Sequence, residues 1–116
     1  MISCKNEMIF YIINKYKKLT NNMQLRSGRT TNEFERMLAN RQANKHQLPG
    51  LFEEYLTLNF KTIRSRILYL ENMLVSTGYQ TLKNMRLIRE TFNKTDHGYA
   101  VMLIGFIRIY ISELNH

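Results

Sequence analysis

Apolar residues recur along most of the chain at spacings of three and four, the period of one face of an α-helix. The first such face contains Ile9, Ile12, Ile13, Tyr16 and Leu19. Positive charge favours the C-terminal end of a helix, and lysines lie there in this segment. We therefore predict an amphipathic helix over residues 1–19. The residues expected to face a partner chain, or less favourably a membrane surface, are Ile9, Ile12, Ile13 and Tyr16.

The next segment, residues 20–31, has no apolar period, and we predict a flexible basic linker there. Asn32 followed by Glu35 has the spacing of a capping box, which predicts a helix from Glu33 to about Lys45. The pair Pro49–Gly50 then predicts a break in the helical pattern.

The longest predicted helix runs from about Leu51 to Ser76. A seam of apolar residues with spacings of four and three follows it, as in a heptad repeat: Leu56, Phe60, Ile63, Ile67, Leu70 and Leu74. Such a seam is either the core face of a bundle helix or a strip that faces a partner chain. The core interpretation is favoured, because three other helices here also carry apolar faces. Gly78 is placed to end this helix as its C′ residue.

Two further helices complete the pattern. The first is predicted from about Thr81 to Thr95, and its apolar face contains Leu82, Met85, Ile88 and Phe92. Asp96 is expected to cap the last helix, from Gly98 to about Leu114, which is apolar nearly all round and should be the most buried. The sequence thus predicts an all-α protein, a compact bundle of four to five helices with a basic flexible segment near residues 20–31, and residues 32–116 form its bundle domain.

Composition supports one folded domain. The chain has 116 residues, 44% of them apolar and 22% charged, which is enough to build a hydrophobic core without disulfides or metal. The net charge is +8 and is unevenly distributed. Residues 1–48 carry nine basic and three acidic side chains, whereas residues 49–116 carry eight and six. The excess of positive charge therefore lies towards the N-terminal end.

Residue patterns typical of catalysis or metal binding are not found. Cys4 is the only cysteine, and His46, His97 and His116 are scattered without a second ligand at helical spacing. No glycine-rich phosphate loop and no serine in a nucleophile-elbow context occur. We therefore expect a non-enzymatic protein without metal, cofactor or small-molecule substrate.

The basic residues form two clusters that favour nucleic acid, bound through phosphate contacts without strong sequence preference. The first cluster contains Lys15, Lys17, Lys18, Arg26 and Arg29, with no acidic residue between them. The second contains Lys83, Arg86 and Lys94. The alternative is a protein–protein interaction module, or a virion structural or adaptor protein, that uses the N-terminal helix and the Leu56–Leu74 seam. Self-association would also fit this alternative.

The segment Met23-Gln24-Leu25-Arg26-Ser27-Gly28-Arg29 resembles the opening of short proteins from large nucleocytoplasmic DNA viruses. The frequent Asn, Ile, Lys and Tyr also resemble the residue usage of such AT-rich genomes. This resemblance implies a small virion or DNA-packaging component, in the host cytoplasm or nucleus or in the virion. Lys5 and Glu7 interrupt the first residues, so we expect an intracellular rather than a secreted protein.

The order of a short, a long and a short helix after a basic segment is also similar to the histone fold. That similarity implies dimerisation through the long helix. It also implies DNA contacts near residues 45–50 and 78–83.

Overall fold

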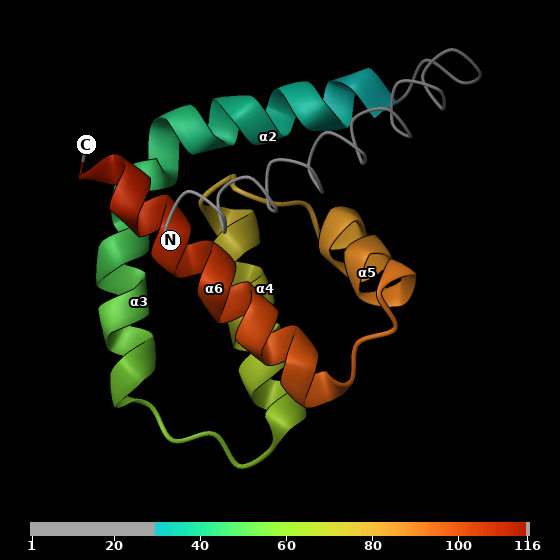
Figure 1. The fold of residues 1–116 in the computed structure, drawn as a ribbon. Helices are drawn as coiled ribbons and strands as arrows, with labels where there is room; N and C mark the ends of the chain where they lie inside the picture. Colours follow the sequence, from blue (N-terminus) through green and yellow to red (C-terminus); the bar gives the residue numbers. More distant parts are fainter. Residues whose placement is uncertain (1–29, 116) are drawn as a thin grey trace. The chain divides into compact units, whose positions relative to one another are not determined.

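A computed structural model describes residues 30–115, which form a helical bundle (Figure 1). Its elements are α2 (Thr30–Asn44), a short 3₁₀ helix (Lys45–Gln47), α3 (Leu48–Thr57), α4 (Ile63–Ser76), α5 (Leu82–Thr91) and α6 (Asp96–Leu114). No strand occurs among residues 30–115, so the predicted all-α class is confirmed. The chain divides into two compact units, Met1–Arg36 and Met37–His116. The helix predicted for residues 1–19 and most of the predicted linker lie outside the described residues.

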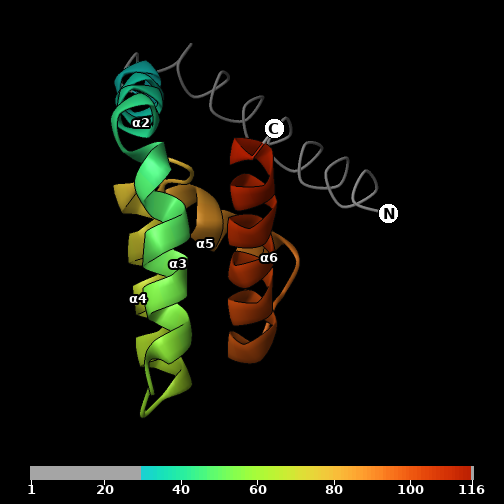
Figure 2. The ribbon, with the colours of Figure 1, turned by 90° about the vertical axis from the view of Figure 1, so that its left-hand side faces the viewer.

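The core of the second unit lies between α4 and α6, which pack against each other along their lengths. Figure 2 shows α3 running beside α4, and α3 also contacts α6. As expected for the most apolar helix, α6 supplies the largest set of buried residues: Tyr99, Ala100, Leu103, Phe106, Ile107 and Tyr110. Its burial removes apolar surface from water and so drives the assembly of the unit.

The prediction of one long helix from Leu51 to Ser76 is wrong. The chain leaves helical geometry after Thr57, with Leu58 extended at φ −89° and ψ 147°. The next helix begins after Thr62, whose side-chain oxygen accepts a hydrogen bond of 3.0 Å from the backbone N–H of Ser65. This cap satisfies one of the free N–H groups of a first helical turn. The helix lengths on which the similarity to the histone fold rested are therefore not those of this protein.

The heptad seam divides with the helix. Ile67, Leu70 and Leu74 on α4 are buried, whereas Leu56 at the end of α3 is 61% exposed. Ile63, the first residue of α4, is 38% exposed. The seam is therefore not one continuous strip, either for the core or for a partner.

The predicted stop at Gly78 is confirmed. Gly78 has φ +75°, and the turn makes both hydrogen bonds of a Schellman motif, from Tyr79 N–H to Leu74 O and from Gly78 N–H to Val75 O. A Cβ atom at Gly78 would lie 2.2 Å from the backbone nitrogen of Arg41. Helix α2 thus passes close to this turn, and only glycine leaves the space for it.

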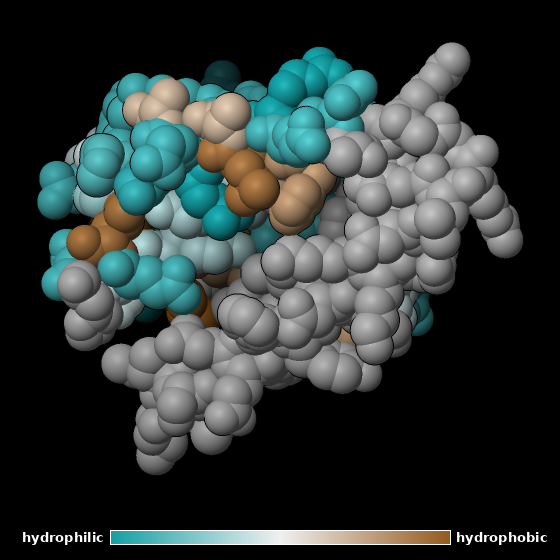
Figure 3. Space-filling view, turned by 90° about the horizontal axis from the view of Figure 1, so that it is seen from above, coloured by the Kyte–Doolittle hydropathy of each residue, from teal (hydrophilic) through white to brown (hydrophobic). Residues whose placement is uncertain are grey.

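Arg41 fastens α2 to the same turn. Its guanidinium donates hydrogen bonds to the carbonyl oxygens of Gly78 and Tyr79, at 3.1 and 3.2 Å. It also lies 4.9 Å from the ring centroid of Tyr79. Figure 3, which looks at the molecule from the α2 end, shows mainly hydrophilic residues broken by small apolar areas. The polar contacts of Arg41 thus help to hold α2 against the turn at Gly78.

Two predicted features of α2 and α3 differ in the structure. Helix α2 begins at Thr30, so Asn32 lies inside the helix rather than at its N-cap, and the last two residues of the predicted linker are helical. The chain bends through the 3₁₀ helix at Lys45–Gln47, and Pro49 lies in the first turn of α3. Proline is tolerated there because its missing N–H would have no intrahelical partner.

The two C-terminal helices also differ in their ends. Helix α5 stops at Thr91, and Phe92 is 48% exposed rather than part of the apolar face. Thr95 caps α6 by accepting a hydrogen bond of 3.1 Å from Gly98 N–H, while Asp96 is the first helical residue. Asp96 still lies where a negative charge suits the helix dipole. No helix within residues 30–115 is long and apolar enough to cross a membrane.

Candidate functional site

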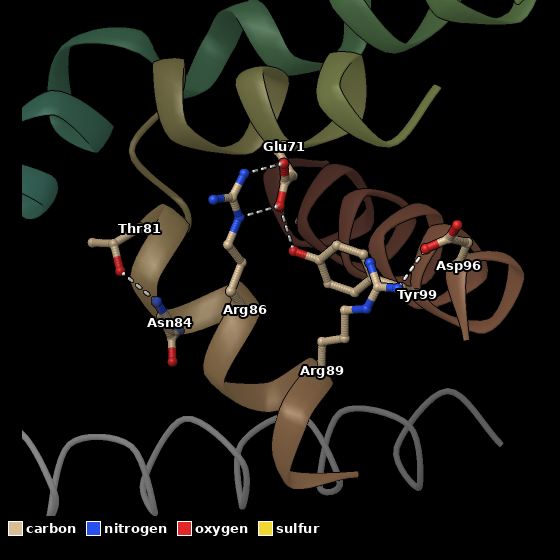
Figure 4. A network of polar contacts seen from close by, with 7 residues as sticks. All are labelled: Glu71, Thr81, Asn84, Arg86, Arg89, Asp96 and Tyr99. Carbon is tan, nitrogen blue, oxygen red and sulfur yellow. Dashed lines mark hydrogen bonds and ion pairs between the residues drawn. The ribbon is translucent and has the colours of Figure 1, made fainter. Parts of the chain in front are cut away.

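A cleft of about 820 Å³ opens between α4, α5 and the first turns of α6. Its walls combine basic, acidic and apolar side chains: Arg64, Ile67, Leu68, Glu71, Lys83, Arg86, Leu87, Arg89, Glu90, Asp96 and Tyr99. Figure 4 shows how the central polar residues come from three helices and converge. Four of the eleven residues are Arg or Lys, which makes this cleft the candidate site for an anionic ligand.

Glu71 is the acidic centre of the cleft and is 2% exposed. Its carboxylate accepts a hydrogen bond of 2.7 Å from the hydroxyl of Tyr99. It also accepts two bonds from Arg86, from Nε and from Nη2, each at 3.3 Å (Figure 4). A buried carboxylate is costly without such partners. Glu71 therefore ties α4 to both α5 and α6.

The environment fixes the charge states of the two donors. Burial and the hydrogen bond to Glu71 raise the pKa of Tyr99 far above its usual value, so this hydroxyl keeps its proton and donates. The hydrogen bond and the negative charge of Glu71 raise the pKa of Arg86. The side chain of Arg86 is nevertheless 56% exposed, so part of its guanidinium still faces solvent.

Arg89 lies one turn further along α5 and joins that helix to α6. It pairs with Asp96, and its guanidinium carbon lies 5.0 Å from the ring centroid of Tyr99. Spacing of three residues on a helix places Arg86 and Arg89 on the same side of α5. Arg86 is thus held by α4, and Arg89 by α6.

Two cations of the cleft remain available. Arg64 on α4 and Lys83 on α5 are both exposed, and neither forms an ion pair within residues 30–115. Glu90 is the one acidic residue of the cleft lining that is likewise unpaired in this part of the chain. The cleft therefore offers two free cations and the exposed side of Arg86 to an anionic ligand.

A second polar network supports the N-terminal turn of α5. Thr81 caps the helix by accepting a hydrogen bond of 3.0 Å from Asn84 N–H (Figure 4). The side-chain amide of Asn84 donates to Gln80, and Gln80 donates to the hydroxyl of Tyr110 at 2.8 Å. Asn84 Oδ1 is buried and has no partner among the described residues. The network joins the N-terminal turn of α5, which carries Lys83, to the end of α6.

The predicted second basic cluster is brought together only in part. Lys83 and Arg86 line the cleft, whereas Lys94 lies in the connection after α5 and does not. Sequence reasoning missed Arg64, Arg89, Glu71 and Tyr99 as members of the site. The spacing of Lys83, Arg86 and Arg89 on one helix was an available signal. No such signal pointed to Arg64 and Glu71 on α4, because their approach to α5 depends on how the helices pack.

The other predicted site residues lie outside residues 30–115. Two sets lie outside the described residues: the basic Lys15, Lys17, Lys18, Arg26 and Arg29, and the apolar Ile9, Ile12, Ile13 and Tyr16. Within residues 30–115, no group of three or more His, Cys, Asp or Glu side chains could hold a metal ion.

Comparisons with known proteins found no matching family model, no matching curated protein and no matching solved structure.

Proposed function

We propose that this protein binds nucleic acid through phosphate contacts, without strong sequence preference. The observation that supports the proposal most directly is the cleft. Basic side chains of α4 and α5 meet there, and Arg64 and Lys83 have no acidic partner within residues 30–115. Unpaired cations on the walls of an open cleft are suited to a polyanion, since each phosphate contact releases a condensed counterion.

The three cations have different roles in this proposal. Lys83 is a flexible point charge that approaches one phosphate oxygen, whereas Arg64 presents a planar fork that binds two. Arg86 adds its solvent-facing guanidinium surface while its other side holds Glu71. Lys94 and the N-terminal residues Lys15, Lys17, Lys18, Arg26 and Arg29 would extend the interaction along the backbone of the nucleic acid.

The test is a titration of the full chain against a labelled DNA duplex and a labelled single strand, followed by fluorescence anisotropy. Affinity should fall steeply between about 50 and 200 mM salt, and similarly for unrelated sequences. Lys83→Glu and Arg64→Glu should each weaken binding. Each should also reduce the slope of log affinity against log salt by about 0.9 for every phosphate that the variant no longer neutralises.

Arg108→Glu is the matched control. Arg108 is exposed on α6, does not line the cleft, and its reversal changes the net charge by the same amount. Binding that Arg108→Glu weakens as much as Lys83→Glu does would place the effect in net charge and overturn the assignment to the cleft. Affinity that does not depend on salt would overturn the phosphate mechanism itself.

The alternative function, an interaction or adaptor module, keeps only part of its basis. The C-terminal half of the Leu56–Leu74 seam is buried within the chain and offers nothing to a partner. Its remaining support is the apolar pattern of residues 1–19 and the exposed N-terminal half of the seam, Leu56 and Ile63. A stable homo-oligomer in light scattering that ignores DNA would favour this alternative.

A further inference from the structure

The connection between α3 and α4 exposes aliphatic side chains beside cations. We call Leu56, Leu58, Lys61, Ile63 and Arg64 the α3–α4 tip. Leu56, Leu58 and Ile63 are 61%, 40% and 38% exposed, and Lys61 and Arg64 are exposed as well. In Figures 1 and 2 this connection projects beyond the ends of the helices that it joins. Exposed apolar residues that gather among charges commonly mark an interaction surface.

The tip has a defined internal support. Phe60 turns inward, with its ring centroid 5.6 Å from that of Tyr55 on α3 and 5.5 Å from that of Tyr69 on α4. The guanidinium carbon of Arg66 lies 5.6 Å from the Phe60 ring centroid, and its Nη1 reaches the Tyr55 hydroxyl. The connection therefore packs the half-buried Phe60 against aromatic rings and leaves the aliphatic residues more exposed.

The two charged residues of the tip itself are cations, whereas the exposed Glu53 and Glu54 lie on α3 just before it. Residues 55–70 contain Lys61, Arg64 and Arg66 and no acidic residue. Arg66 is engaged with the aromatic cluster, whereas Lys61 and Arg64 form no ion pair within residues 30–115. The surface that complements the tip must therefore accept aliphatic groups and carry negative charge.

We propose that the α3–α4 tip binds the surface of an anionic phospholipid bilayer. Leu56, Leu58 and Ile63 enter the boundary between headgroups and acyl chains, and Lys61 and Arg64 contact the headgroup phosphates. The sequence analysis considered a membrane surface only for the N-terminal helix, and there as the less favoured partner. The inference shares Arg64 with the proposed nucleic-acid cleft, but it rests on the exposed aliphatic residues of the tip, which lie outside the cleft lining.

Other occupants fit the tip less well. In a two-fold contact between two tips, each tip would have to supply acidic partners for Lys61 and Arg64 of the other, and the tip contains no acidic residue. Nucleic-acid bases stack on exposed aromatic rings, and the aromatic residue of the tip, Phe60, is already packed between Tyr55 and Tyr69. A bilayer needs no shaped groove, so a projecting tip suits it.

The chain contains no tryptophan, so a single introduced one reports on its own surroundings. The full-length Leu58→Trp variant is mixed with vesicles of phosphatidylcholine, alone or with phosphatidylserine at about one part in four. The fluorescence of this variant should shift to the blue with the anionic vesicles and remain unchanged with the neutral ones. Val101→Trp is the matched control, because Val101 is 55% exposed on α6 and lies outside the tip and the cleft lining.

Co-sedimentation with the same vesicles tests the contribution of the aliphatic side chains. The double substitution Leu56→Ser and Leu58→Ser should lower the affinity for anionic vesicles about tenfold, since serine side chains lack the apolar area that inserts. The Val101→Ser control should bind like the original chain. The double variant should bind DNA as the original chain does. A negative result with vesicles would therefore overturn only the lipid proposal and not the proposed nucleic-acid binding.

Three results would overturn the proposal. The first is no binding of the full chain to anionic vesicles at low salt. The second is equal binding by the double variant, which would assign the lipid interaction to another part of the chain. The third is a homo-oligomer that the double variant dissociates, which would make the tip an interface between copies.

Discussion

The two halves of the apolar seam have the same spacing and opposite surroundings. Leu56 and Ile63 lie at the ends of separate helices and are largely exposed, whereas Leu70 and Leu74 on α4 are fully buried. Spacings of four and three show only that the residues would share a face if the chain were helical throughout. They carry no information on whether the helix continues or on what covers the face.

The physical difference lies in what is available to cover each half. Helix α6 packs along α4 and buries Ile67, Leu70 and Leu74. At the other end of the seam the chain reverses direction within the five residues 58–62, and Thr62 begins a new helix. The first half therefore belongs to a turn, where side chains on the outside have no neighbouring helix.

Removing a buried member of the seam should have the largest effect. Leu70→Ala should lower the free energy of unfolding by about 2–5 kcal/mol, because it leaves a cavity against α6. Leu56→Ala, the same substitution in the exposed half, should change it by less than about 0.5 kcal/mol. Urea unfolding followed by circular dichroism measures both. Similar losses for the two variants would contradict the division of the seam.

Helix α4, which carries the buried half of the seam, also carries Glu71, and removing the hydrogen bond from its partner Tyr99 should have the second-largest effect. Tyr99→Phe removes the hydroxyl that donates to Glu71, and we expect a loss of about 1–3 kcal/mol in the free energy of unfolding at neutral pH. Tyr69→Phe is the control, because the Tyr69 hydroxyl makes no hydrogen bond within the described part of the chain and Tyr69 is only partly buried.

The same substitution should change the response to alkaline pH. The folded pKa of Tyr99 is raised above the value of about 10 in the unfolded chain, so its contribution is complete below pH 10 and is lost as the pH rises further. Above pH 10 this group should lower the free energy of unfolding by up to about 1.4 kcal/mol for each further pH unit. Tyr99→Phe should lack that contribution, as urea unfolding at about pH 9 and pH 11 would show. If the free energy of unfolding depended on pH equally in Tyr99→Phe and in the original chain, this prediction would be wrong.

The boundary between the two halves should give the smallest effect. Thr62→Ala removes the N-cap of α4 and should cost about 1 kcal/mol. Thr57→Ala is the matched control, because the Thr57 hydroxyl bonds to Glu54 O within α3 and caps no helix start. Thermal unfolding of the two variants gives the comparison. Equal stability would mean that the cap of Thr62 does not set where α4 begins.

Local signals explain which parts of the fold could be predicted. The stop at Gly78 follows from the left-handed conformation that glycine accepts most easily, and the strongly apolar run after Gly98 indicates a buried helix. The caps Thr62, Thr81 and Thr95 are equally local, and each accepts a hydrogen bond from the third residue after it. Thr62 was overlooked because the apolar seam continued across it.

The candidate site was less predictable, for a different reason. Lys83 and Arg86 are near in sequence and share a helix face, so their spacing was enough to group them. Arg64 and Glu71 are on another helix, and Tyr99 is on a third. Their approach depends on the crossing of α4, α5 and α6, which no pattern within one helix specifies.

The sequence by itself determined the helical class, the sites of several helix ends and the uneven charge. These depend on interactions within a few residues, such as caps, the conformation of glycine and the period of apolar side chains. Only the tertiary structure decided which half of the seam was buried, which acid Arg86 would hold and which aliphatic residues would remain in water. Those outcomes depend on which helix lies opposite, because burial and charge pairing are properties of two surfaces that touch.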